Sequence, residues 1–156
     1  MISRRAFLTH AAGLAAAATG ARSAWAAVRA PAPTSITVYK SKSCLCCNKW
    51  VDHVRENGFA PTVHDDEDMD RIKDEMGVPK GVRSCHTAMV DKYLIEGHVP
   101  AADIRRLLAE RPKAAGLAAP GMPSSAPGML EPGASVKPYD VVAFTSAGTT
   151  TVYSRH

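Results

Sequence analysis

Four cysteines carry the chemistry that this sequence offers most clearly, and three of them stand together. Cys44, Cys46 and Cys47 form a Cys-Leu-Cys-Cys motif at the predicted start of a helix, and Cys85 follows much later in the chain. Unpaired backbone N–H groups and the helix dipole at such a position stabilise a thiolate over a thiol. Thiolates bind soft metal ions and attack disulfides, so both kinds of chemistry are open here.

The spacing of the clustered cysteines favours metal binding. Cys44 and Cys47 have the Cys-x-x-Cys spacing of a thioredoxin-type disulfide, but Cys46 between them can scramble such a bond. Adjacent thiolates are useful for bridging neighbouring soft ions, whereas zinc prefers one tetrahedral centre. We therefore predict copper(I), as one ion or more than one, ahead of zinc. A structural disulfide with one free thiol is the plainer alternative.

A second group of donors lies in Ser84-Cys85-His86-Thr87, just before a predicted strand. Thioredoxin-like proteins place the loop that faces their Cys-x-x-Cys motif at this point, and here a thiol and an imidazole stand where such proteins have a proline. If the fold prediction holds, Cys85 and His86 approach Cys44, Cys46 and Cys47 within a few ångströms. The predicted pocket then offers four sulfurs and one nitrogen to a soft metal ion.

Further donors are weaker candidates. His98 precedes a predicted helix, where it either binds the metal or orients another ligand. Met122 and Met129 each follow Pro-Gly in a polar segment, and a thioether there could close over copper(I). The same pattern would result if these methionines served only as hydrophobic contacts that hold the segment against the domain. His53 and His64 are predicted to be solvated surface residues.

The elements that would position these residues alternate between strands and helices. β-branched and aromatic runs indicate strands, while apolar residues at helical spacing and terminating glycines indicate helices. The predicted order is β-α-β-α-β-β-α, which is typical of a thioredoxin-like α/β domain. The predicted elements are a strand at 36–39, a helix from the cysteines to 57, a strand at 59–64, a helix at 69–76, a hairpin at 87–90 and 93–96, and a helix from 100.

The chain divides into four predicted parts. Residues 27–35 are a Pro- and Ala-rich linker, and residues 36–112 form the thioredoxin-like domain. Residues 113–156 are a C-terminal extension packed on that domain. The extension begins with an irregular Pro- and Gly-rich arm and ends in a hairpin of residues 141–145 and 149–153.

Residues 1–26 read as a signal peptide for the Tat route. Arg4-Arg5 precedes an apolar run that is too short and weak for a membrane-spanning helix, and Ala24-Trp25-Ala26 offers a cleavage site. We therefore expect a periplasmic protein with no membrane insertion after cleavage. Removal of this segment takes three arginines and no acidic residue, which lowers the net charge from +4 to +1. The remaining charge gives no support for nucleic-acid binding.

Together these motifs resemble the CopG-like periplasmic copper-resistance proteins. The resemblance spans roughly residues 36–153 and implies a thioredoxin-like domain that binds copper through the Cys-x-Cys-Cys cysteines, with help from the Ser-Cys-His-Thr loop. It leaves open whether members act catalytically. The matching segments are 38–41, 44–50, 84–88, 95–101, 116–123 and 127–129.

The leading hypothesis is a copper(I)-binding protein for resistance, detoxification or transfer, with a periplasmic copper donor or acceptor protein as partner. The rival is an enzyme, a periplasmic thiol-disulfide oxidoreductase in which Cys44 attacks and Cys47 resolves. The absence of a proline from the facing loop weighs against that rival. A disulfide-stapled interaction module is the third class, and it predicts neither metal binding nor exchange activity.

Overall fold

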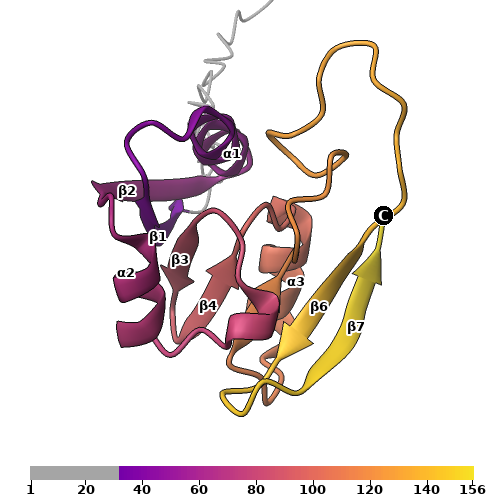
Figure 1. The fold of residues 1–156 in the computed structure, drawn as a ribbon. Helices are drawn as coiled ribbons and strands as arrows, with labels where there is room; N and C mark the ends of the chain where they lie inside the picture. The colour runs from indigo at the N-terminus through magenta and orange to yellow at the C-terminus, as the bar shows by residue number, and fades with distance from the viewer. Residues whose placement is uncertain (1–31) are drawn as a thin grey trace, which may run out of the picture. The chain divides into compact units, whose positions relative to one another are not determined.

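The computed structural model describes residues 32–156, which form one compact unit. The predicted signal peptide and most of the predicted linker lie outside the described residues. The described chain contains a mixed sheet with helices on both sides, so the prediction of a single α/β domain is confirmed (Figure 1). The finer thioredoxin-like assignment stays a prediction.

Every predicted helix and strand is present, and most have ends shifted by one or a few residues. The strands β3 and β4 have the predicted bounds. In chain order the elements are β1 (Thr34–Lys40), α1 (Leu45–Glu56), β2 (Phe59–Asp65), α2 (Met69–Glu75), the 3-10 helix η1 (Lys80–Val82), β3 (Thr87–Val90), β4 (Tyr93–Glu96), α3 (Ala101–Glu110), β5 (Gly116–Ala118), β6 (Asp140–Phe144) and β7 (Thr150–Arg155).

The seven strands form one sheet in the order β2-β1-β3-β4-β5-β6-β7. The pairs β1–β2 and β4–β5 are parallel, and the other four neighbouring pairs are antiparallel. The first strand therefore lies inside the sheet, and the loop that follows it carries the cysteine motif. The loop before β3 emerges beside it, because β3 runs antiparallel to β1.

The short strand β5 was not predicted. It lies in the segment that the sequence indicates to be irregular, and its three residues give no periodic pattern. Gly116 is needed there because a Cβ atom would lie 1.9 Å from the carbonyl oxygen of Leu94 on β4. Since β5 also pairs with β6, the C-terminal hairpin continues the sheet of the domain. Residues 119–139 of the arm contain neither helix nor strand.

Helices cover the two faces of the sheet in separate layers. One face packs against α1 and α3 through a core that includes Val38, Trp50, Ile95 and Leu107. The opposite face carries a smaller cluster around Phe144, together with the segment from α2 to η1. In Figure 1, α3 lies behind the strands and α2 in front of them. The metal-binding candidates lie where α1 meets the ends of β1 and β3.

Within the described residues, no helix has the length and apolar character needed to cross a membrane.

Candidate metal centre

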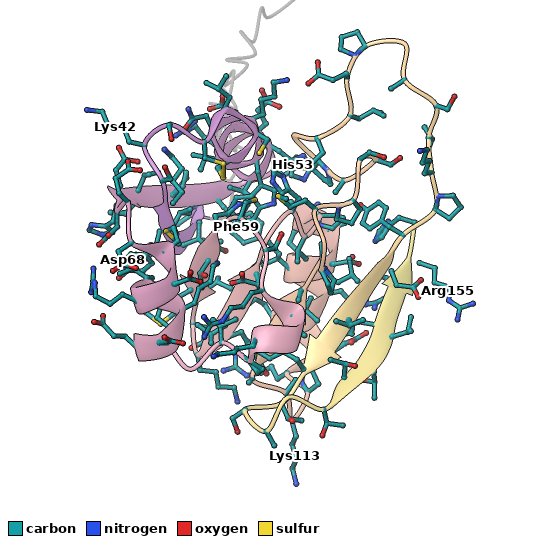
Figure 2. All side chains as sticks on the ribbon, in the orientation of Figure 1. Lys42, His53, Phe59, Asp68, Lys113 and Arg155 are labelled. Atoms are coloured by element: carbon teal, nitrogen blue, oxygen red, sulfur yellow. A yellow bond between two sulfur atoms is a disulfide. The ribbon has the colours of Figure 1, made fainter. Side chains whose placement is uncertain are left out.

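Four sulfur atoms from two distant parts of the chain lie together. Cys44 is the N-terminal cap of α1, Cys46 and Cys47 are in its first turn, and Cys85 lies in the loop between η1 and β3. Their sulfur atoms are all within 4.8 Å of one another. Figure 2 shows sulfur atoms gathered beneath α1, near the labelled His53. The fold therefore brings together the four cysteines that the sequence selects as metal ligands.

Two of these cysteines are joined in a disulfide. Cys44 and Cys47 are bonded across a Cα–Cα distance of 5.3 Å, while Cys46 and Cys85 are free thiols. The sulfur of Cys46 lies 3.5 Å from that of Cys44, close enough for thiol-disulfide exchange without a large movement. A metal ion can use all four sulfurs as thiolates only after this bond is reduced.

A nitrogen-rich group adjoins the sulfurs. Cys47, Cys85, His86 and His98 also offer ligand atoms that all lie within 4.8 Å of one another. His98 Nδ1 lies 2.7 Å from the carbonyl oxygen of Pro127, and its Nε2 lies 3.0 Å from Cys85 Sγ. A carbonyl oxygen only accepts hydrogen bonds, so Nδ1 carries the proton and Nε2 presents its lone pair to the centre. His98 Nε2 is thus directed toward the cysteines with its lone pair available.

His86 is completely buried beside Cys85. Its Nδ1 lies 3.4 Å from Cys85 Sγ, and its ring packs against that of Trp50 at a centroid distance of 4.3 Å. Within residues 32–156, His86 Nε2 is one of two buried side-chain nitrogen or oxygen atoms that lack a hydrogen-bond partner. Unpaired buried polar atoms are rare in folded proteins, so this nitrogen is an uncommon feature of the buried pocket. The indole N–H of Trp50 donates to the carbonyl of Val99, which fixes the ring that supports His86.

Burial sets the charge state of these groups in the metal-free chain. Burial, followed by the nearby Cys46, raises the pKa of Cys85 to about 11, so its thiol is protonated at neutral pH. Burial, with His98 and Lys73 acting in the same direction, holds the pKa of His86 well below 6.5. Burial also lowers the pKa of His98. Both imidazoles are therefore neutral and able to bind a metal, while a metal that binds Cys85 must displace its proton.

A buried ion pair behind the Cys85 loop was missed by sequence reasoning. Lys73 Nζ donates to Glu96 Oε1 at 2.6 Å, and the same oxygen accepts the backbone N–H of Ser84 at 2.6 Å. Glu96 Oε2 accepts the hydroxyl of Thr87, also at 2.6 Å. Glu96 therefore fixes the residues on both sides of Cys85-His86. Burial raises the pKa of Glu96, and Lys73 opposes this shift. Lys73 stands among charged residues in α2, so its sequence pattern indicates an exposed side chain.

The arm contacts the centre through its backbone. Besides the Pro127 carbonyl on His98, Gly128 lies so close to α1 that a Cβ atom there would be 2.8 Å from Trp50 N and 2.9 Å from the carbonyl of Cys46. The φ angle of Gly128 is +83°, a conformation that favours glycine. The Pro-Gly pattern before Met129 therefore has a structural reason that does not involve the thioether. The Met129 side chain is half-buried.

The other candidate residues lie as follows. Met122, the second arm methionine, is 49% exposed. His64 is exposed and stacks against Tyr39. His53 was predicted to be a solvated surface residue, but it is half-buried and accepts the backbone N–H of Ala101 at 3.1 Å. It thus satisfies one of the free N–H groups at the start of α3, which no local sequence pattern around His53 indicates.

The donor set fits one or more soft or borderline metal ions. Thiolate sulfur suits copper(I), and imidazole suits both copper and zinc. A sulfur and a nitrogen bound to one tetrahedral ion at about 2.3 and 2.0 Å are roughly 3.5 Å apart. The distances from Cys85 Sγ to His98 Nε2 and His86 Nδ1, 3.0 and 3.4 Å, are close to this value. Binding therefore requires only small movements of these side chains.

Comparisons with known proteins give matches to solved structures and to one family model. Two structures, described as "Copper resistance protein copG", form 1 and form 2, each match with 43% sequence identity and a TM-score of 0.73. Each match covers 80% of this chain and 98% of the other chain. Residues 82–129 match a family model described as a protein of unknown function, DUF411. No curated protein sequence matches this chain.

Proposed function

The chain belongs to the CopG-like copper-resistance family, and on this premise we propose that it binds copper(I) in copper resistance, detoxification or transfer. The observation that carries the proposal is the convergence of Cys44, Cys46, Cys47 and Cys85, whose sulfurs lie within 4.8 Å of one another. In the reduced chain these four thiolates are the main ligands, and His86 adds a nitrogen donor. His98 is a further donor from the same pocket.

The crowding of the sulfurs supports the binding of more than one copper ion. Copper(I) accepts few ligands, and a thiolate can bridge two ions, so adjacent thiolates can serve several ions together. One zinc ion would use four of these donors in a tetrahedral centre and leave the remaining donors without a metal. Copper(I) is therefore the proposed cargo, and zinc ranks below it.

The chain's setting in the cell is also a proposal. The Arg-Arg pair and cleavage pattern of residues 1–26 support export by the Tat route to the periplasm. The partner there is a copper donor or acceptor protein.

The parallel β1–β2 pair and the antiparallel β3–β4 pair, with α1 following the first strand, support the thioredoxin-like assignment of residues 36–112. Residues 113–156 are the proposed extension of that domain.

Thiol-disulfide exchange is the second candidate function, and the Cys44–Cys47 disulfide at the start of α1 favours it. In the reduced chain, the Cys44 thiolate would attack a substrate disulfide and form a mixed disulfide. Cys47 would then attack that bond and release the substrate as a dithiol, so two electrons and two protons pass to the substrate. The free thiol of Cys46, 3.5 Å from Cys44, offers a competing partner and weakens this candidate.

An anaerobic copper(I) titration tests the proposal. The chain is reduced, freed of reductant and titrated in competition with a copper(I) chelator, and its copper and zinc contents are then measured by elemental analysis. We expect stoichiometric copper(I) uptake that zinc does not displace, and reduced uptake in Cys85→Ser. His64→Gln, which alters an exposed histidine, is the matched control and should bind as the unaltered chain does.

Copper(I) uptake that is the same in Cys85→Ser and the unaltered chain would contradict the proposal. Rapid reduction of a test disulfide by the metal-free chain, lost in Cys44→Ser, would favour the exchange enzyme instead.

A further inference from the structure

We propose that the Cys44–Cys47 disulfide selects between two overlapping metal sites. In the chain with this disulfide formed, called the closed chain below, Cys85, His86 and His98 bind one divalent ion of the borderline class, such as zinc(II) or copper(II). This inference rests on the proposed function for its reduced state, in which the four thiolates hold copper(I). It adds a second site, a second class of ion and a condition that decides which site is present.

The two sites share residues but differ in chemistry. The four sulfurs form one group, and Cys47, Cys85, His86 and His98 form the other. Cys85 is the free thiol common to both groups, since Cys47 is bonded to Cys44. An ion in the nitrogen-rich group therefore occupies the sulfur that the copper(I) site also needs. The two sites cannot be filled independently.

Closure of the disulfide removes two thiolates from the sulfur-rich group. A disulfide sulfur carries no negative charge, and the thiolate is the form of cysteine that binds metal. The closed chain keeps Cys46 and Cys85 as thiols, but Cys46 is outside the group that contains the histidines. The closed chain thus offers one thiolate and two imidazoles, a set that suits borderline divalent ions better than clustered copper(I).

The nitrogen-rich site is already formed while the disulfide is closed. His98 Nε2 is directed at Cys85 Sγ because its Nδ1–H donates to the Pro127 carbonyl. His86 is fully buried, and its Nδ1 lies 3.4 Å from the same sulfur. Three protein ligands leave a fourth position of a tetrahedral ion for water or for an incoming ligand. Such an open position would allow the ion to be passed to a partner.

Opening the disulfide requires a dithiol reductant. One thiolate of the reductant attacks Cys44 Sγ, the S–S bond breaks, and Cys47 leaves as a thiolate that takes up a proton. The second reductant thiol then attacks the mixed disulfide and releases Cys44, so the reductant becomes a disulfide and the chain gains two electrons and two protons. Cys44 is half-buried and Cys47 fully buried, which makes Cys44 the accessible sulfur.

Metal titrations of the closed and the reduced chain test this inference. The closed chain is prepared with its disulfide intact and verified by thiol counting, which should find two free thiols. Zinc(II) alone is titrated by competition with a coloured chelator, and cobalt(II) serves as the spectroscopic probe. The thiolate-to-cobalt charge-transfer band reports how many thiolates bind, so the closed chain should show a weaker band per ion than the reduced chain.

Two variants separate the ligands from the redox control. His98→Asn keeps a donor for the Pro127 carbonyl but removes Nε2, so the zinc affinity of the closed chain should fall by more than about 10-fold. Thermal melting checks that the variant is folded. The double variant Cys44→Ser/Cys47→Ser cannot form the disulfide, and it should bind cobalt like the closed chain under both oxidising and reducing conditions.

The possible outcomes distinguish this inference from the proposed function. If the closed chain binds no zinc or cobalt, or if its cobalt spectrum matches that of the reduced chain, the second site is refuted and copper(I) binding by the reduced chain is unaffected. If the closed chain binds as expected but the reduced chain fails to take up copper(I), the proposed function is refuted and the divalent site is supported.

Discussion

Replacing Gly128 with alanine tests whether the arm holds the metal centre in place. Gly128 has a positive φ angle, and an alanine Cβ atom there would lie 2.8 and 2.9 Å from two backbone atoms of α1. Ordinary contacts at a Cβ begin near 3.4 Å, so the arm and α1 must separate by several tenths of an ångström. Because both neighbours are backbone atoms, no side-chain rotation can relieve the contact.

Gly133→Ala is the matched control for this change. Gly133 lies in the same arm with a φ angle of +81°, and nothing lies within 4 Å of a Cβ atom there. Both variants therefore carry the same backbone strain, about 1–2 kcal/mol, while only Gly128→Ala adds overpacking of about 1–3 kcal/mol. We expect the melting temperature of Gly128→Ala to be lower than that of the control by about 4 °C for each added kcal/mol.

The same comparison has a metal-binding readout. Displacing the arm takes the Pro127 carbonyl away from His98 Nδ1, and loss of such a supporting hydrogen bond costs about 10–100-fold in metal affinity. Chelator competition on both variants measures this change. Equal melting temperatures and equal metal affinities for Gly128→Ala and Gly133→Ala would refute the role assigned to the arm.

Three further predictions address other parts of the structure. Glu96→Ala leaves Lys73 buried without its counter-ion, so unfolding by denaturant should show a loss of about 3–5 kcal/mol. The double change Lys73→Met/Glu96→Gln should lose far less than the sum of the losses in Lys73→Met alone and Glu96→Gln alone. Burial lowers the pKa of His53 below 6.5, so its contribution to stability is present above that pH and is lost as the pH falls. Below pH 6.5 the unfolding free energy of His53→Gln should therefore fall less steeply with decreasing pH than that of the unaltered chain. The two slopes should differ by well under about 1.4 kcal/mol per pH unit, because water screens the half-buried side chain. Parallel curves for the two proteins would contradict this prediction. Changing Met122 and Met129 together to leucine should leave the bound copper(I) per chain unchanged, and a lower copper content would identify the thioethers as ligands.

Local sequence patterns were enough to predict the elements that position the cysteines. The β-branched run of β1, the apolar spacing in α1 and the Asn57-Gly58 stop are all short-range features, and the structure has each of them. The α/β class follows from their order. The proximity of Cys85 to the cysteine motif could be predicted only from a fold that makes β3 the neighbour of β1.

Features that depend on tertiary contacts could not be predicted in this way. β5 has three residues and exists because β4 and β6 flank it, so its sequence carries no strand period. The burial of Lys73 depends on Glu96, which is 23 residues away. The role of His53 depends on α3, which begins 48 residues later. No local pattern encodes such long-range pairings.

X-ray absorption at the copper edge gives the most direct test of the central claim, that the reduced chain gathers copper(I) on the four cysteines. The spectrum of the copper-loaded reduced chain should show sulfur as the main scatterer, and the number of sulfurs per copper should fall in Cys85→Ser. A first shell made mainly of nitrogen or oxygen, or an unchanged sulfur number in Cys85→Ser, would contradict the account.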